Sequence, residues 1–129
     1  MKKKILYIED NEQNLYLVTF ILEKNGYEVI AARDGLEGIE TAARVLPELI
    51  LLDIQLPRMD GYSVARQLRE NPDLEVIPIV AVTSYAMVGD RDKALAAGCN
   101  GYIEKPINPD TFMHQVERHL KNQVGGDER

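Results

Sequence analysis

The chain has 129 residues, which suits one domain and is long enough to bury about two thirds of the surface that its unfolded form exposes. Apolar residues make up 45% of the chain and charged residues 28%, so the composition excludes a disordered or fibrous protein. The formal net charge is −6, which argues against nonspecific nucleic-acid binding because such binding needs a positively charged surface.

The sequence contains no pattern typical of export or membrane insertion. Cys99 is the single cysteine, so no intramolecular disulfide can form and nothing requires an oxidising compartment. The apolar run at residues 5–8 is too short for a signal peptide, and no stretch approaches the roughly 18 apolar residues of a membrane span. We therefore expect a cytoplasmic protein with neither membrane nor nucleic acid as a direct partner.

Five short aliphatic runs alternate with segments whose apolar residues recur at helical spacing. The predicted strands cover residues 4–8, 28–32, 49–52, 77–83 and 101–105. Helical spacing is found for Leu15, Val18 and Leu22, for Leu36, Ile39 and Ala43, for Val64 and Leu68, and for Phe112, Val116 and Leu120. Strands that are apolar almost throughout indicate a parallel sheet covered on both faces. The pattern predicts an α/β fold of the doubly wound (βα)5 type.

Helix boundaries are marked by residues that favour helix ends. Asp34 followed by Glu37 is typical of a helix start, and Asn108 before Pro109 predicts another. Gly26 and Gly98 stand where helices are expected to stop. Residues 123–129 have no apolar periodicity, so we expect a domain over residues 1–122 followed by a flexible tail at 123–129.

Polar side chains with related chemistry follow four of the predicted strands. In an open parallel sheet the carboxyl ends of the strands lie at one edge, which is where ligands bind. The residues at these ends are Glu9 and Asp10, then Asp53, then Thr83 and Ser84, and finally Glu104 and Lys105. Crowded carboxylates attract a hard divalent cation, and Mg²⁺ or Mn²⁺ prefers oxygen ligands. Asp10, Asp53, Glu9 through a water molecule, and one backbone carbonyl would form part of its coordination shell.

The lysine and the hydroxyl complete a site suited to phosphoryl transfer. That reaction needs charge neutralisation and positioning, which a metal ion, the Lys105 ammonium and the Thr83 hydroxyl supply. Asp53 would then be the nucleophile, because a carboxylate can accept a phosphoryl group as an aspartyl-phosphate.

Four motifs in order resemble the response-regulator receiver domain of two-component signalling, and the resemblance covers about residues 3–121. They are IEDN at 8–11, LLDIQLPRMDG at 51–61, VTS at 82–84 and EKP at 104–106. The resemblance implies a flavodoxin-like sheet of order 2-1-3-4-5 with helices on both faces, and a cis bond between Lys105 and Pro106. It also implies site roles: Glu9 and Asp10 as the acidic metal pocket, Asp53 as phosphoacceptor, Gln55 as a metal ligand through its backbone carbonyl, Thr83 as switch hydroxyl, Tyr102 as switch aromatic, and Lys105 as the phosphate-binding lysine.

Within that family, the motif sequences most resemble those of stand-alone regulators of cell division and polarity. Receiver domains of hybrid histidine kinases share many of the same residues. The acidic pair is Glu9-Asp10 where the family has Asp-Asp, so the first of the two side chains is one methylene group longer. By resemblance, a histidine kinase or a histidine phosphotransfer protein is the phosphodonor. The binding surface for a downstream protein, whose identity is unknown, is expected at residues 87–97, Tyr102 and residues 107–116. The protein would be a monomer or a phosphorylation-dependent dimer.

Other interpretations of the same residues remain open at this point. Asp53 and Asp10 could cap helices, Asn11 or Asn14 could take that cap instead, Lys105 could be a solvated surface lysine, and Thr83 and Tyr102 could be ordinary strand residues. His114 and His119 lack the spacing of a metal pair and are expected at the surface or its boundary. Cys99 is expected to fill a small buried space, and Met59, Met87 and Met113 to pack in the core or at an interface.

The sequence disfavours three alternatives to a phosphorylation switch. An aspartyl phosphatase would carry DxDx[TV], but Gln55 stands two residues after Asp53, so the general acid of such an enzyme is absent. Neither GxGxxG nor GxxxxGK[ST] occurs, which argues against a nucleotide site. A binding module without phosphorylation is disfavoured by the complete set of site residues. Gln55 and Tyr85 flank the expected phosphate site and are predicted to tune the lifetime of the aspartyl-phosphate.

Overall fold

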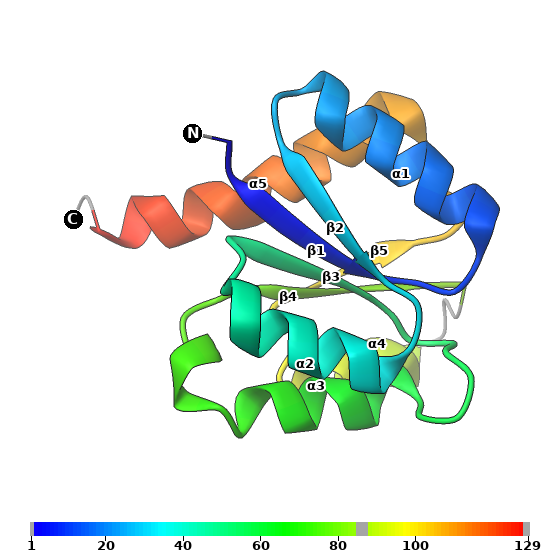
Figure 1. Cartoon of the computed structure of the whole chain (residues 1–129), viewed down its shortest axis with the longest axis vertical. Coiled ribbons are helices and arrows are strands. Elements are labelled where there is room, and N and C mark those ends of the chain that lie inside the picture. The colour runs from blue at the N-terminus through cyan, green and yellow to red at the C-terminus, as the bar shows by residue number, and fades with distance from the viewer. Residues whose placement is uncertain (1, 85–87, 128–129) are drawn as a thin grey trace.

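Strands and helices alternate along the whole of the described chain (Figure 1). The computed structural model describes the backbone of residues 2–84 and 88–127 and the side chains of residues 2–84 and 89–120. The strands are β1 (Lys4–Ile8), β2 (Glu28–Ala32), β3 (Leu49–Asp53), β4 (Ile79–Thr83) and β5 (Gly101–Glu104). The helices are α1 (Glu12–Lys24), α2 (Gly35–Val45), α3 (Gly61–Arg69), α4 (Val88–Ala96) and α5 (Pro109–Asp127), with a 3-10 turn, η1 (Pro72–Leu74), after α3.

The five strands form one parallel sheet in the order β2-β1-β3-β4-β5. Ile8 pairs with Leu52, and Asp53 pairs with Val82, so β1, β3 and β4 end close together at one edge. The order confirms the predicted doubly wound fold. Because strand order reverses between β1 and β3, the carboxyl ends of these two strands flank the crevice in which such folds bind ligands.

Helices cover both faces of the sheet, α1 and α5 on one side and α2, α3 and α4 on the other (Figure 1). Successive side chains of a strand point to opposite faces. In β3, Leu49 and Leu51 therefore pack with α1 and α5, whereas Ile50 and Leu52 pack in the core beneath the other three helices. Every residue of β3 is buried, which explains why the strand is apolar up to Asp53.

The helix ends follow the predicted signals. Asn11 caps α1 and accepts the Asn14 N–H over 2.9 Å, so the capping role falls to this residue and not to Asp10. Asp34 caps α2 and accepts the Glu37 N–H over 2.8 Å. Gly26, with φ of 92°, follows the end of α1 in the left-handed region that glycine adopts without strain.

Three predicted strand boundaries differ from the structure, the first being β3, which extends to Asp53, one residue beyond its predicted end. β4 begins at Ile79 and not at residue 77, because Pro78 has no N–H to donate, although its carbonyl accepts the Ile50 N–H. β5 ends at Glu104, one residue earlier than predicted. Helix α5 continues to Asp127, and the division of the chain at residue 122 stays a prediction. Within the residues that the structure describes, no helix has both the length and the apolar character needed to cross a membrane.

Arg69, the last residue of α3, joins segments that are distant in the sequence. Its guanidinium donates to the Gly98 carbonyl over 2.9 Å and to the Leu74 carbonyl over 2.8 Å. It also donates to Asn100 Oδ1 over 2.6 Å, and this oxygen accepts the Ile79 N–H as well. The end of α3, the turn after it, and the connection from α4 to β5 are thereby held together at the amino-terminal edge of the sheet.

Candidate functional site

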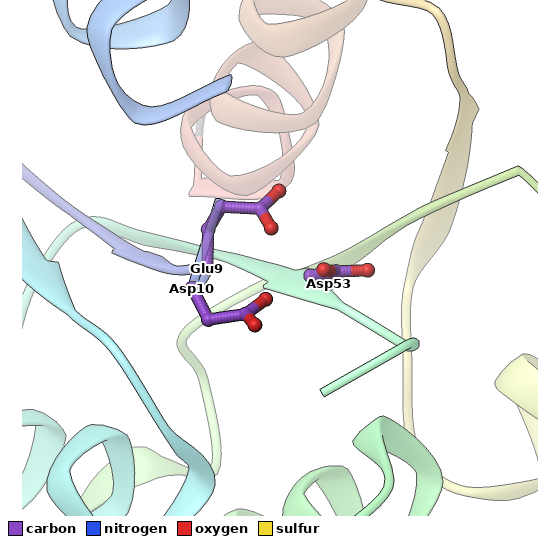
Figure 2. A group of neighbouring side chains, drawn as sticks. All are labelled: Glu9, Asp10 and Asp53. Atoms are coloured by element: carbon purple, nitrogen blue, oxygen red, sulfur yellow. The ribbon is translucent and has the colours of Figure 1, made fainter. Parts of the chain in front are cut away.

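Three carboxylates meet at the carboxyl ends of β1 and β3. Figure 2 shows Glu9 and Asp10 after β1, with their side chains directed toward Asp53 at the end of β3. One oxygen from each of the three lies within 4.8 Å of the others. Glu9 and Asp53 are buried, whereas Asp10 is exposed to solvent. The structure thus brings the predicted acidic pocket together, with one open side.

Glu9 is the most heavily bonded member of this cluster. The Tyr7 hydroxyl donates to Glu9 Oε1 over 2.7 Å, and the backbone N–H of Asn11 donates to Oε2 over 3.2 Å. Burial favours the neutral form of Glu9, but hydrogen bonds from Asp53 and Tyr7 and the charge of Lys105 hold its pKa below its usual range. Glu9 therefore remains ionised although its side chain is shielded from water.

Lys105 lies between the two buried carboxylates. Its Nζ is 3.1 Å from Glu9 Oε1 and 3.3 Å from Asp53 Oδ2, and only 13% of its side chain is exposed. The alternative of a solvated surface lysine is therefore wrong. The Lys105–Pro106 peptide bond is cis, as the resemblance implied.

Asp53 lies in an environment that opposes its ionisation. Burial and the neighbouring Glu9 raise the pKa of its carboxyl to about 7, against partial compensation from the Gln55 N–H and the Lys105 ammonium. Its Oδ1 accepts that N–H over 2.9 Å, and Asp53 caps no helix, since the cap of α3 is Asp60. The Gly61 N–H donates to the Ile54 carbonyl and not to Asp53. A Cβ at residue 61 would lie 2.8 Å from the Asp53 carbonyl oxygen, which is too close for any residue other than glycine without a shift of the backbone.

The two residues expected to act as a switch lie on neighbouring strands. Thr83 is fully buried at the end of β4, and its carbonyl accepts the Lys105 N–H over 2.8 Å. Tyr102 on β5 packs against the core beneath α2, α3 and α4, and its hydroxyl is buried without a hydrogen-bond partner among the described residues. Thr83 therefore lies beside the lysine of the site, whereas Tyr102 packs in the core behind it.

Gln55 contributes to the site through a contact that the sequence did not predict. Its side-chain Oε1 accepts the backbone N–H of Ser84 over 3.1 Å, which joins the loop after β3 to the end of β4. Tyr85 and Met87, two residues singled out from the sequence, lie outside the described part of the chain.

Tyr7 is a site residue that sequence reasoning missed. It lies in an apolar strand and looks like a core residue, and it is indeed fully buried. The available signal was its position two residues before Glu9, because residues i and i+2 of a strand share a face. A polar hydroxyl on the face that carries a buried carboxylate is a natural donor to it.

Residues that the sequence excluded from the site lie elsewhere. His114 is exposed and His119 half-buried, as expected. Cys99 is buried in the core, and burial raises the pKa of its thiol to about 11, so the thiol stays protonated. Met59 packs against the core beneath α2, α3 and α4, and Met113 packs against the core beneath α1 and α5, which confirms their predicted packing role.

The chemistry of the acidic cluster fits a divalent cation. Three oxygen donors converge, and two of them are buried with a single lysine as their cationic partner among the described residues. The raised pKa of Asp53 indicates that Lys105 alone does not neutralise the pair. Mg²⁺ accepts such a small set of carboxylates and keeps water molecules in its remaining positions.

Comparison with known proteins agrees with this geometry. The response regulator receiver domain family matches residues 5–117. The polar-differentiation response regulator DivK of Brucella anthropi is 41% identical over 120 residues, which cover 93% of this chain and 98% of that protein. DivK of Brucella abortus strain 2308 shares the same identity and coverage.

Solved structures support the same assignment. A CheY-like receiver domain from Methanospirillum hungatei superposes with a TM-score of 0.89 at 30% identity and covers 98% of this chain and 99% of its own. The receiver domain of a sensor histidine kinase from Pseudomonas aeruginosa, at 34% identity and a TM-score of 0.84, covers 97% and 99% of the two chains and holds a magnesium ion in its active-site cleft. The chain described here belongs to the response-regulator receiver domains of two-component signalling.

Proposed function

We propose that this receiver domain is a phosphorylation switch in which Asp53 accepts a phosphoryl group from a phosphohistidine on a histidine kinase or a histidine phosphotransfer protein. The observation that carries the proposal is the convergence of Asp53, Glu9, Asp10 and Lys105 at one edge of the sheet. The phosphodonor and the metal are carried over from the family and from the magnesium-bound relative.

In the transfer step an Asp53 carboxylate oxygen attacks the phosphorus atom. An O–P bond forms, the N–P bond of the phosphohistidine breaks, and its electron pair stays on the imidazole nitrogen, which takes a proton from solvent. Lys105 lies 3.3 Å from Asp53 Oδ2 and is placed to neutralise a phosphoryl oxygen, and the buried Thr83 supplies a hydroxyl from β4. When bound by Glu9, Asp10, Asp53 and the Gln55 carbonyl, Mg²⁺ or Mn²⁺ supplies further charge neutralisation for the transferred group.

The phosphoryl group is then lost to water by hydrolysis. A water molecule attacks the phosphorus atom and gives up a proton to solvent, the O–P bond to Asp53 breaks, and the carboxylate leaves with its electron pair. This self-catalysed loss is the single hydrolytic reaction that we assign, so the protein acts as a signalling component and not as a metabolic phosphatase. Gln55 lies at the mouth of the site and is expected to influence how fast that water molecule reaches the phosphorus atom.

The modified carboxylate carries about −1.5 to −2 charge units and three acceptor oxygens, which draw Lys105 and Thr83 toward it. The signal is then expected to pass through β4 and β5 to a binding surface on α4, β5 and α5, where Tyr102 rearranges with Thr83. Of the predicted surface, residues 88–97, Tyr102 and residues 107–116 lie within the described chain, and Met87 does not. Dimerisation on phosphorylation and a cytoplasmic location stay predictions.

Intact-protein mass spectrometry tests the proposal directly. Incubation with Mg²⁺ and acetyl phosphate should add one phosphoryl group to the wild type and to Asp92→Asn, a matched change at an exposed α4 residue. Asp53→Asn should remain unmodified. Absence of the added mass in the wild type, or equal labelling of Asp53→Asn, would exclude Asp53 as the acceptor, and sustained turnover of a phosphomonoester would favour an enzyme instead.

A further inference from the structure

The Gln55 side chain accepts a hydrogen bond from a backbone N–H beside the proposed phosphoacceptor. Ser84 is the first residue after β4, and its N–H donates to Gln55 Oε1 over 3.1 Å. The backbone N–H of the same Gln55 donates to Asp53 Oδ1 over 2.9 Å. One residue therefore connects the carboxylate of Asp53 with the first backbone donor beyond Thr83.

The strand register places that donor near an attached phosphoryl group. Asp53 pairs with Val82 in the parallel β3–β4 ladder, so the chain beyond Thr83 runs beside the chain beyond Asp53. A phosphoryl group on Asp53 extends past the carboxyl end of β3 into this space. Its oxygens are strong acceptors, and the Ser84 N–H follows Thr83 on the neighbouring strand, on the side toward which such a group would extend.

A phosphoryl oxygen is a better partner for this N–H than the amide oxygen of Gln55. Hydrogen bonds to an ionised acceptor are roughly twice as strong as those between neutral groups. The Gln55 side chain is exposed, so its release into water leaves no buried polar atom behind. The exchange is therefore favourable once a phosphoryl group is present.

We propose that Gln55 is a positioning residue whose amide oxygen holds the Ser84 N–H in the unphosphorylated protein and is displaced from it by a phosphoryl oxygen on Asp53. The inference rests on the proposed function, because Asp53 must carry the phosphoryl group. The Gln55–Ser84 hydrogen bond stabilises the unphosphorylated state and competes with phosphoryl binding. Removing the acceptor at residue 55 removes that competition.

Binding of beryllium trifluoride, a tetrahedral phosphoryl mimic, measures the competition. In Mg²⁺, Gln55→Met should bind the mimic about two- to tenfold more tightly than the wild type, which is the ratio expected from losing one neutral hydrogen bond in the free state. Gln67→Met, the same change at an exposed α3 residue, should leave the affinity unaltered. Calorimetric titration gives the three affinities.

Amide hydrogen exchange at Ser84 tests the hydrogen bond without reference to phosphorylation. In the free protein the Ser84 amide should exchange faster in Gln55→Met than in the wild type. Gln55→Glu keeps an acceptor at the same reach and should restore the slow exchange. Equal exchange in the wild type and Gln55→Met, or an affinity for the mimic that is unchanged or weaker in Gln55→Met, would overturn the proposed competition.

The two proposals fail in different ways. If the wild type does not bind the mimic, or binds it equally after Asp53→Asn, then Asp53 is not the acceptor and both proposals fall. If the wild type binds it through Asp53 while Gln55→Met shows no gain in affinity, the phosphoacceptor role stands and the role of Gln55 is refuted.

Discussion

At the scale of single residues, Glu9 and Asp53 form a buried acidic pair that is held together by Lys105. Two carboxylates out of water repel each other, so their pKa values move apart. The pKa of Glu9 is lowered and this group stays ionised, whereas the pKa of Asp53 is raised, which favours its neutral form. The ammonium contacts both carboxylates, so its removal affects both. Such a pair is poised to gain from any further cation that enters.

Lys105→Gln tests the role of the ammonium. Because Lys105 lowers the pKa of Asp53, the substitution should raise that pKa further above its present value of about 7. Carbon-13 NMR of labelled aspartate in EDTA follows the titration. Lys93→Gln, a change at an exposed α4 lysine, should leave the Asp53 titration where it is. An unchanged Asp53 titration in Lys105→Gln would show that the ion pair is not formed in solution.

Tyr7→Phe tests the hydroxyl that holds Glu9. Losing the 2.7 Å hydrogen bond leaves a buried carboxylate oxygen with fewer donors, so the free energy of unfolding should fall by about 1–2 kcal/mol and the pKa of Glu9 should rise. Urea unfolding at neutral pH measures the first effect. Tyr16→Phe, on a side chain that is 76% exposed, is the matched control and should change the unfolding free energy little.

At the scale of elements, the sheet sets the positions of the site residues. Arg69 joins the end of α3 to the turn after it and to the connection from α4 to β5. Arg69 donates to carbonyls of Gly98 and Leu74 and to the Asn100 side chain, at the edge of the sheet opposite the acidic cluster. The connection from α4 to β5 is therefore tied to α3. Any shift of α4 on phosphorylation is expected to be larger at its start than at its end.

Arg69→Gln should be markedly more destabilising than Arg66→Gln on the same helix. Arg69 bonds acceptors from two segments outside its own helix, whereas Arg66 is exposed and bonds only the Ser63 hydroxyl among described residues. We expect Arg69→Gln to lower the free energy of unfolding by about 1–3 kcal/mol through the loss of donors to these acceptors. Urea unfolding compares the two variants, and equal midpoints would contradict the role assigned to Arg69.

At the scale of the whole molecule, the folded state opposes the ionisation of Asp53 that the proposed function requires. The folded state raises the pKa of this carboxyl from 3.8 to about 7. Its contribution to stability is thus fully present below pH 3.8 and is lost as the pH rises through 7. At neutral pH, ionisation of the buried Asp53 carboxyl therefore lowers the stability of the metal-free protein.

Asp53→Asn removes this dependence. In EDTA, the variant should gain stability relative to the wild type as the pH rises from 5 to 8, by about 1–3 kcal/mol, because the wild type alone must ionise a buried carboxyl. Chemical denaturation at the two pH values gives the difference. Asp92→Asn, at an exposed aspartate, should follow the wild type. A difference between wild type and Asp53→Asn that does not grow with pH would contradict the raised pKa.

Much of the fold and of the site could be predicted because each rests on local pattern. The apolar runs located all five strands, and the polar residues at or just past their predicted ends were Glu9, Asp10, Asp53, Thr83 and Lys105. The contacts of Tyr7, the Gln55 side chain and Arg69 could not be predicted in the same way. They depend on strand register and on loops that approach one another across the sheet, which no single stretch of sequence specifies.

The strand order brings together residues that lie far apart along the chain: Glu9 comes from its beginning, Asp53 from its middle and Lys105 from near its end. A fragment that lacks either end of residues 9–105 does not hold the complete set, and an unfolded copy keeps Asp53 without Lys105 and Glu9 beside it. Under the proposed function, misfolded copies and such fragments would accept no phosphoryl group and would consume none of the phosphodonor. The size of the cellular response should follow the number of intact copies, and not the total amount of polypeptide made.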